Sequence, residues 1–227
     1  EKIYNRKLIK EEIYLLIDIF PEILRPNIIK MLRYLKNQKK KHNCQKVVIY
    51  TNNIGPNNWV NTIKGYLEYK IKGNLFDKII RAYKINNIQI EPNRTEHGKT
   101  YEDLLRCLNV DEIENVCFID DQMHPMIDDE RVNSLQIPPY YKDYRTFDII
   151  TRLLNSPFKK SFNDLNYFIH YVNNNYDTEK YFNDNEVMYN ELDDQVLANH
   201  LKRFIRKTKP HKTRVYRTIS NNKTRRI

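Results

Sequence analysis

Short unbroken apolar runs alternate along the chain with longer segments in which apolar residues recur at helical spacing. Residues 47–51 and 116–120 are runs of β-branched and aromatic side chains, a pattern typical of strands that are buried on both faces. Residues 76–83 form another such run, and 135–137 predict a short strand that ends before Pro138. These runs therefore indicate a sheet that is covered by helices on both sides.

Helical spacing predicts helices between and around these strands. Residues 8–20 mix helical and strand-like spacings, and we assign them to a helix. Further helices are predicted from Pro26 to the basic run 39–41 and over residues 59–67, 99–109, 147–154 and 162–172. Strands that alternate with helices at these lengths favour βαβ units, so the predicted fold class is α/β with a Rossmann-like, mainly parallel sheet.

The pattern divides the chain into three regions. Residues 1–157 form the predicted α/β domain, in which 84–98 is a polar loop with a small hairpin around Asn86 and Asn87. Residues 158–199 predict an α-helical extension, and residues 200–227 predict a basic interaction tail.

The net charge of +10 lies entirely in this tail. Residues 200–227 hold 11 basic residues and no acidic one, and removing these from the 39 basic residues of the chain leaves 28 against 29 acidic. Such a block indicates an arm that binds nucleic acid, an acidic protein or an anionic membrane, and Phe204 and Tyr216 could stack on bases. A solvated tail that only raises solubility is the alternative. The basic residues expected to bind are Lys202, Arg203, Arg206, Lys207, Lys209, Lys212, Arg214 and Arg217.

Bulk properties place the expected protein inside the cell, in the cytoplasm or nucleus. No apolar run approaches the ~20 residues of a membrane span, and no signal-peptide pattern opens the chain. At 227 residues with 40% hydrophobic content, the chain can bury the core of a full α/β domain. Cys44, Cys107 and Cys117 are expected to be reduced structural thiols rather than metal or redox centres.

Polar residues suited to phosphate follow two of the predicted strands. Thr51 and Asn52 end one strand, Asp120 and Asp121 end another, and Lys99 opens the helix between them. Ligands bind open α/β sheets at the carboxyl ends of the strands, so these side chains should face one crevice. A hydroxyl, an ammonium and two carboxylates would meet there.

Each candidate residue also has a structural explanation. Threonine is a good strand former, and adjacent aspartates can cap a helix, because a helix N-terminus favours negative charge. His97 and His124 could move protons or bind phosphate, but exposed or structural histidines are the simpler interpretation. For Arg94, a surface salt bridge is the simpler alternative to phosphate binding.

The order of three elements resembles the haloacid dehalogenase (HAD) superfamily of phosphotransferases. These elements are a strand that ends in Thr51, a later helix that begins at Lys99 and a strand that ends at 120–121. Residues 24–26, followed by a helix and Val-Val-Ile-Tyr-Thr, resemble its NLI-interacting-factor-like branch, which includes phosphatases of the RNA polymerase II C-terminal tail. The resemblance covers residues 22–155. Similar HAD-like proteins are encoded by large DNA viruses, so a virion component is a further expectation.

The resemblance implies a role for each candidate. Thr51 matches the second family motif, whose hydroxyl donates to a phosphoryl oxygen, and Asn52 lies beside it in the substrate site. Lys99 matches the third motif, whose cation neutralises phosphate. Asp120 and Asp121 match the fourth motif, with Asp120 as a Mg²⁺ ligand and Asp121 as a second ligand or an outer partner. The implied activity is Mg²⁺-dependent hydrolysis of a phosphomonoester or phosphoprotein through an aspartyl-phosphate.

The chain departs from the family at the nucleophile. The motif Asp-x-Asp-x-Thr/Val of the central strand does not occur in the 227 residues. Its nearest imitation starts at Asp18, but Phe20 stands where the family has its general acid, so we assign no nucleophile.

Two expectations follow from this departure. Either the motif lies upstream and the chain belongs to an active phosphatase, or the chain is a catalytically inactive HAD fold that serves as a structural or scaffolding protein in a larger assembly. Because a sheet without its central strand exposes backbone donors, a strand from upstream, from a partner or from residues 13–19 should fill that position.

Overall fold

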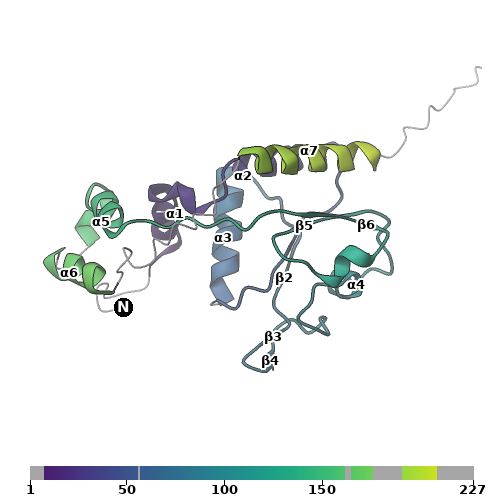
Figure 1. The fold of residues 1–227 in the computed structure, drawn as a ribbon, viewed down its shortest axis with the longest axis horizontal. Coiled ribbons are helices and arrows are strands. Elements are labelled where there is room, and N and C mark those ends of the chain that lie inside the picture. Colours follow the sequence, from purple (N-terminus) through teal and green to yellow (C-terminus); the bar gives the residue numbers. More distant parts are fainter. Residues whose placement is uncertain (1–7, 56, 162–164, 176–190, 209–227) are drawn as a thin grey trace, which may run out of the picture.

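The computed structural model describes residues 8–55, 57–161, 165–175 and 191–208 of the chain (Figure 1). Its helices are α1 (Lys10–Ile19), α2 (Ile28–Lys40), α3 (Asn57–Lys70), α4 (Tyr101–Leu108), α5 (Thr146–Leu154), α6 (Leu165–Asn175) and α7 (Glu191–Lys207). Its strands are β1 (Val48–Tyr50), β2 (Lys78–Ile80), β3 (Lys84–Ile85), β4 (Ile88–Gln89), β5 (Val116–Asp120) and β6 (Val132–Gln136). Short 3₁₀ helices lie at η1 (Pro21–Ile23), η2 (Pro125–Asp128) and η3 (Pro157–Ser161).

The predicted α/β class with parallel strand pairing is confirmed at this coarse level. β1 pairs with β2 in parallel, and β5 pairs with β6 in parallel. β3 and β4 form the predicted hairpin, whose turn residues Asn86 and Asn87 have φ values of 50° and 63°. A two-residue turn of this kind needs positive φ at both positions, which asparagine tolerates well.

Three strand predictions differ from the structure. Of the predicted strand 76–83, only β2 (Lys78–Ile80) forms a strand. β6 begins at Val132, earlier than predicted, because it pairs with β5 from Val116↔Val132 to Asp120↔Gln136. Its polar Asn133 and Ser134 break the apolar run that sequence reasoning looks for. The idea that residues 13–19 supply a strand is wrong, because they lie in helix α1.

Helix α4 covers one face of both parallel pairs. Its buried side chains meet residues of β2, β5 and β6 in a single cluster that consists of Ile80, Tyr101, Leu104, Cys107, Phe118, Met126 and Val132. Val48 and Tyr50 of β1 pack against the same cluster. One helix therefore bridges the two pairs on this face.

Helices α2 and α7 lie on the opposite face. Met31 of α2 packs with Leu197 and Leu201 of α7, and partly buried residues of β5 and its surroundings join them, namely Cys117, Ile119, Leu135 and Ile137. Val47, which directly precedes β1, packs against a neighbouring cluster that consists of Leu32, Ile71 and Leu75. Ile28 and Leu35 of α2 pack against both clusters, so α2 also bridges the two pairs.

A separate helical cluster lies beside the strands (Figure 1). Leu153 of α5 packs with Phe158 of η3 and with Phe168 and Val172 of α6, and partly buried residues of α1 close this core. Residues on both sides of the predicted boundary between 157 and 158 therefore pack in one hydrophobic cluster. The predicted boundary at residue 200 falls inside helix α7, which begins at Glu191.

Among the described helices, none combines the length and the apolar character that crossing a membrane requires.

The bridging role of α4 gives a stability prediction. Leu104 is 6% exposed and lies in the cluster that both strand pairs share. Leu104→Ala should lower the free energy of unfolding by about 2–5 kcal/mol, because it removes buried methyl groups and leaves a cavity. Urea denaturation measures this change. Glu102→Ala, on the exposed side of the same helix, should change it by less than about 0.5 kcal/mol. Equal effects of the two substitutions would contradict the bridging role.

Glu22 links η1 to α5 through charged hydrogen bonds. Arg152 donates to its carboxylate at 2.8 and 2.9 Å, and the Tyr144 hydroxyl donates at 3.1 Å. The hydrogen bond from Arg152 lowers the pKa of Glu22 from 4.5 to about 2.

This pKa shift predicts a pH dependence. A carboxylate whose pKa falls on folding stabilises the folded state above its unfolded pKa, and the contribution is lost as the pH falls toward the folded pKa. The stability difference between the unsubstituted chain and Glu22→Gln should be complete above about pH 4.5 and shrink toward pH 2. Urea denaturation over this range measures it. A difference that does not change with pH would exclude the ion pair as its cause.

Candidate functional site

Lys99 and Asp120 form a buried ion pair at the carboxyl edge of the strands. Lys99 directly precedes Thr100, the N-cap of α4, and Asp120 is the last residue of β5. The Lys99 ammonium donates a hydrogen bond to Oδ2 of Asp120, and the two side chains are 7% and 12% exposed. Two residues selected from the sequence for phosphate chemistry are thus in direct contact.

The surroundings keep Asp120 ionised. Its Oδ1 accepts a hydrogen bond from the Gln122 N–H at 3.0 Å and lies 3.5 Å from Nε2 of His124. Burial alone would raise the pKa of Asp120, but the hydrogen bonds from Lys99 and Gln122 outweigh it and lower that pKa. Burial lowers the pKa of His124, which favours the neutral imidazole.

The Lys99 ammonium also lies between β1 and β5. Its Nζ is 5.9 Å from the ring centre of Tyr50 on β1 and 6.0 Å from that of Phe118 on β5. Aromatic faces attract cations at this range. The Lys99 carbonyl accepts a hydrogen bond from the Met126 N–H at 3.0 Å, which fixes Lys99 to the segment after β5.

Arg94 organises the loop that leads to Lys99. It is 1% exposed, so the expected surface salt bridge is wrong. Its guanidinium donates to the carbonyls of Arg81, His97 and Gly98 at 2.8–2.9 Å and to Oδ1 of Asn52 at 2.7 Å. Arg94 therefore ties the loop after β1 to the loop before α4.

Asp103 is a buried residue that sequence reasoning missed. Its side chain is fully buried, accepts hydrogen bonds from the Thr95 N–H at 3.1 and 3.2 Å and lies 3.8 Å from Nε of Arg94. Its own N–H donates to the hydroxyl of Thr100 at 3.1 Å. The sequence signal was present, since Thr-x-x-Asp at positions 100 and 103 is a helix-capping pattern.

Thr51 and Asn52 lie at the carboxyl end of β1 as predicted. The Thr51 hydroxyl accepts a hydrogen bond from the Asn53 N–H at 3.0 Å. The Asn52 amide donates to the His97 carbonyl at 3.0 Å and accepts from Arg94. Asn52 thus positions the loop, while no hydrogen bond joins Thr51 to Lys99 or Asp120 among the described contacts.

Asp121 lies apart from its neighbour. It is exposed, and the described contacts of its side chain include no hydrogen bond or ion pair, while its carbonyl accepts from Nε2 of Gln136 at 3.3 Å. In the described parts of the chain, no group of three or more His, Cys, Asp or Glu side chains is placed to hold a metal ion. Asp120 is therefore the carboxylate that the structure places beside Lys99.

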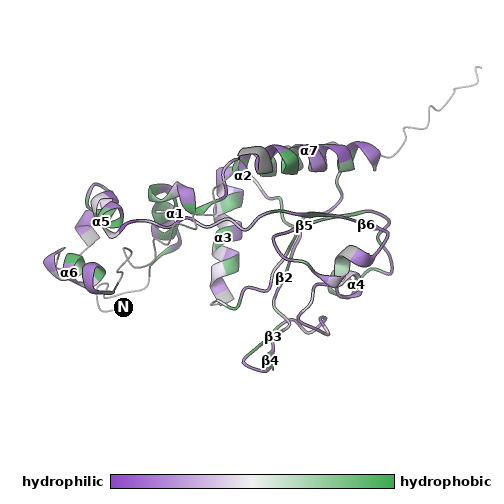
Figure 2. Ribbon diagram, viewed as in Figure 1, coloured by the Kyte–Doolittle hydropathy of each residue, from purple (hydrophilic) through white to green (hydrophobic). Residues whose placement is uncertain are grey.

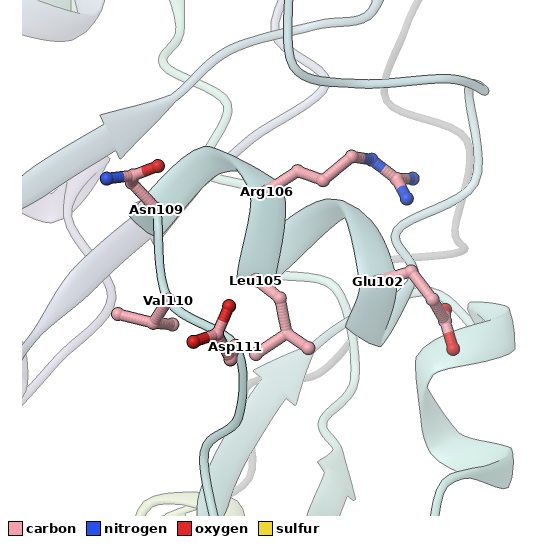
Figure 3. Close-up of a pocket in the computed structure, with 6 residues that line it drawn as sticks. All are labelled: Glu102, Leu105, Arg106, Asn109, Val110 and Asp111. Carbon is pink, nitrogen blue, oxygen red and sulfur yellow. The ribbon is translucent and has the colours of Figure 1, made fainter.

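A small hollow opens beside Asp120. It has a volume of about 180 Å³ and is lined by Phe118, Asp120, Gln122, Met123, Ser134, Leu135 and Gln136. A larger hollow of about 580 Å³ lies along α4 and the residues after it, lined by Glu102, Leu105, Arg106, Asn109, Val110 and Asp111 (Figure 3). Of the candidate residues, Asp120 lines the smaller hollow and none lines the larger one, so we place the site at the smaller hollow.

The other candidates lie elsewhere. Asp18 on α1 accepts hydrogen bonds from the Tyr66 hydroxyl at 2.6 Å and from Lys70 at 2.8 Å on α3, away from the strand ends. His97 is exposed, and its ring packs edge-on against Tyr83. Cys44, Cys107 and Cys117 form no disulfide among the described residues, and Cys107 is buried.

The proposed basic tail is partly helical. Lys202, Arg203, Arg206 and Lys207 are exposed on α7, whereas Leu201 and Ile205 on the same helix are buried. Figure 2 shows hydrophilic and hydrophobic residues alternating along this helix. Lys209, Lys212, Arg214 and Arg217 lie outside the described residues.

Comparison of the chain with known protein families, with curated proteins and with solved structures gives no match.

The contacts of Arg94 give a prediction for the site. Arg94→Met should lower the free energy of unfolding by about 3–5 kcal/mol, because it leaves several buried carbonyls without donors and removes one of the two cations beside the buried Asp103 carboxylate, the other being Arg106. Arg94→Lys should recover only part of this loss, since an ammonium cannot reproduce the planar fork. Chemical denaturation measures both, with the exposed Lys78→Met as the control. Full recovery by lysine would show that charge alone matters at this position.

Proposed function

We propose that the chain forms the phosphate-handling part of a HAD-like, Mg²⁺-dependent phosphatase that hydrolyses phosphomonoesters, including phosphoproteins. The observation that carries the proposal is the buried Lys99–Asp120 pair at the carboxyl edge of β5, beside the end of β1. A buried ammonium can donate to a phosphate oxygen, and a carboxylate in contact with it can bind a metal ion at the neighbouring position.

The donor set at Asp120 suits Mg²⁺ rather than a softer metal. Its carboxylate supplies oxygen, and Mg²⁺ commonly takes one or two carboxylates together with waters and substrate phosphate. When bound, the ion would neutralise charge on the phosphoryl group and polarise it. Asp120 would hold it, with its carboxylate oriented by the Gln122 N–H.

The remaining residues position the substrate. In the proposed site the Lys99 ammonium donates hydrogen bonds both to Asp120 and to a phosphoryl oxygen of the substrate. The Thr51 hydroxyl donates to another phosphoryl oxygen. Arg94 and Asn52 hold the loops that carry these groups. His124, neutral and 3.5 Å from Asp120, is the nearest group that could take up a proton.

The attacking carboxylate of the proposed aspartyl-phosphate step is not among the described residues at this edge. Asp120 is paired with Lys99, and Asp18 is bound to α3. The proposal therefore assigns binding, charge neutralisation and metal coordination to the described residues, and it leaves attack to a carboxylate outside them.

A second candidate function is binding without turnover. Lys99 is already neutralised by Asp120, and exposed basic side chains occupy the C-terminal part of α7. A catalytically inactive HAD fold with these features would act as a scaffold that binds phosphate, nucleic acid or an acidic protein.

Hydrolysis of p-nitrophenyl phosphate by the intact protein, with any sequence that flanks the 227 residues, tests the first candidate. We expect activity that requires Mg²⁺ and that falls on the order of 10²-fold in Asp120→Asn, because the metal ligand is lost. Asp143→Asn, which changes an exposed carboxylate outside the site, should leave the rate unchanged. Circular dichroism of each variant confirms that it is folded.

The same samples separate the two candidates. Absence of hydrolysis, combined with phosphate binding that Asp120→Asn alters by calorimetry, would support the scaffold. Hydrolysis that continues at the same rate in Asp120→Asn would exclude this edge as the active site.

A further inference from the structure

The small hollow beside Asp120 combines a charged group with an apolar surface. Asp120, which holds the Lys99 ammonium, is part of its lining. Phe118, Met123 and Leu135 contribute apolar residues to the same lining. The ring centre of Phe118 lies 6.0 Å from Nζ of Lys99. A group bound to Lys99 therefore has an apolar surface beside it.

The hollow lies where α4 no longer covers β6. Val132, the first residue of β6, is buried in the cluster that α4 shares with both strand pairs. Ser134 and Gln136 follow at alternate positions, so their side chains point to the same face as that of Val132, yet both residues are exposed. They pair with Phe118 and Asp120 of β5. This end of the sheet face is therefore accessible to a ligand.

Met123 adds a large apolar side chain to the hollow. It lines the hollow and is 67% exposed. An exposed apolar side chain is stabilised when a ligand removes it from water. The flexible thioether of methionine also makes favourable contacts with aromatic rings. The surface beside the ion pair is thus suited to a flat apolar group.

The size of the hollow fits one aromatic ring. Its volume of about 180 Å³ is close to that of an apolar cavity of roughly 150 Å³ that binds benzene. The single methylene group of a phosphoserine side chain would leave most of this volume to water and would bury little of the apolar surface. The hollow therefore distinguishes an aromatic substrate from a short aliphatic one.

We propose that the hollow receives the aromatic ring of the substrate, so that the site takes aryl phosphate esters, such as phosphotyrosine, in preference to alkyl phosphate esters. This inference rests on the proposed function in one respect, since it takes the phosphate to lie at Lys99 and Asp120. The ring would pack against Phe118 and Met123.

Binding of two phosphonates to the intact protein, measured by calorimetry with Mg²⁺ present, tests the proposal. Benzylphosphonate carries an aromatic ring and methylphosphonate does not, and neither is hydrolysed, because a carbon–phosphorus bond replaces the ester bond. At a pH at which both are dianions, benzylphosphonate should bind on the order of tenfold more tightly, because only its ring buries apolar surface in the hollow.

Ser134→Phe makes the test specific to the hollow. The new ring occupies the hollow beside Phe118, so the preference for benzylphosphonate should fall from about tenfold to about one. Asn133→Phe is the matched control. Asn133 is also exposed on β6, but its side chain points to the opposite face, so the preference should remain.

Met123→Ala provides a second variant outside the buried core. It removes apolar surface from the lining and should lower the preference about threefold. Circular dichroism of each variant confirms that it is folded.

A peptide separates the two sources of an aryl phosphate. It carries phosphonomethyl-phenylalanine, which replaces phosphotyrosine and resists hydrolysis, between glycine residues. Binding as tight as that of benzylphosphonate would support the proposal with protein-bound phosphotyrosine as the substrate. Binding of benzylphosphonate that is more than about tenfold tighter than that of the peptide would support it with small aryl phosphates instead.

Three results would overturn the proposal. Equal affinities for the two phosphonates would reject the aromatic subsite and leave the phosphate site and the proposed function in place. A preference for benzylphosphonate that persists in both Ser134→Phe and Met123→Ala would place the ring elsewhere. If neither phosphonate binds, the phosphate site itself is rejected, and the proposed function fails together with this inference.

Discussion

A buried ammonium needs an anion beside it, and this requirement at Lys99 determines how the carboxyl ends of the strands are arranged. Leaving one charge of a buried pair alone costs several kcal/mol, so Asp120 must end β5 where its carboxylate reaches Lys99. Lys99 in turn directly precedes the N-cap of α4 and contacts the rings of Tyr50 and Phe118. One charge pair thus connects the ends of β1 and β5 with the start of the helix that covers both.

The buried polar groups around this pair form a supporting layer. Arg94 and Asp103 are both buried, and together they bind the loop after β1, the loop before α4 and the first turn of α4. These contacts hold the two strand pairs in one layer although no strand pairing joins them in the described chain. The candidate site is therefore a consequence of this arrangement: the helices and the polar network connect the two pairs, whereas among the described residues the sheet does not.

Prediction from the sequence succeeded where the pattern is local. The unbroken runs at β1 and β5, the hairpin at Asn86 and Asn87 and the helix after Lys99 follow from side-chain periodicity and turn chemistry. Prediction failed where contacts between distant segments determine the burial of a side chain or the length of a strand. Arg94 resembles a surface residue in sequence but is buried by carbonyls from distant segments, and β6 is extended by pairing with β5 through polar residues. Asp121 could not be separated from Asp120 by sequence alone, because only the direction of the strand end decides which carboxylate meets Lys99.

A double-mutant cycle on Lys99→Met and Asp120→Asn tests the central role of the pair most directly. Urea denaturation gives the free energy of unfolding for the unsubstituted chain, both single variants and the double variant. The account predicts that each single substitution destabilises the chain by about 3–5 kcal/mol and that the double variant loses at least about 1 kcal/mol less than the two losses combined. Losses that add without coupling would contradict the account, because they would show that Lys99 and Asp120 do not depend on one another.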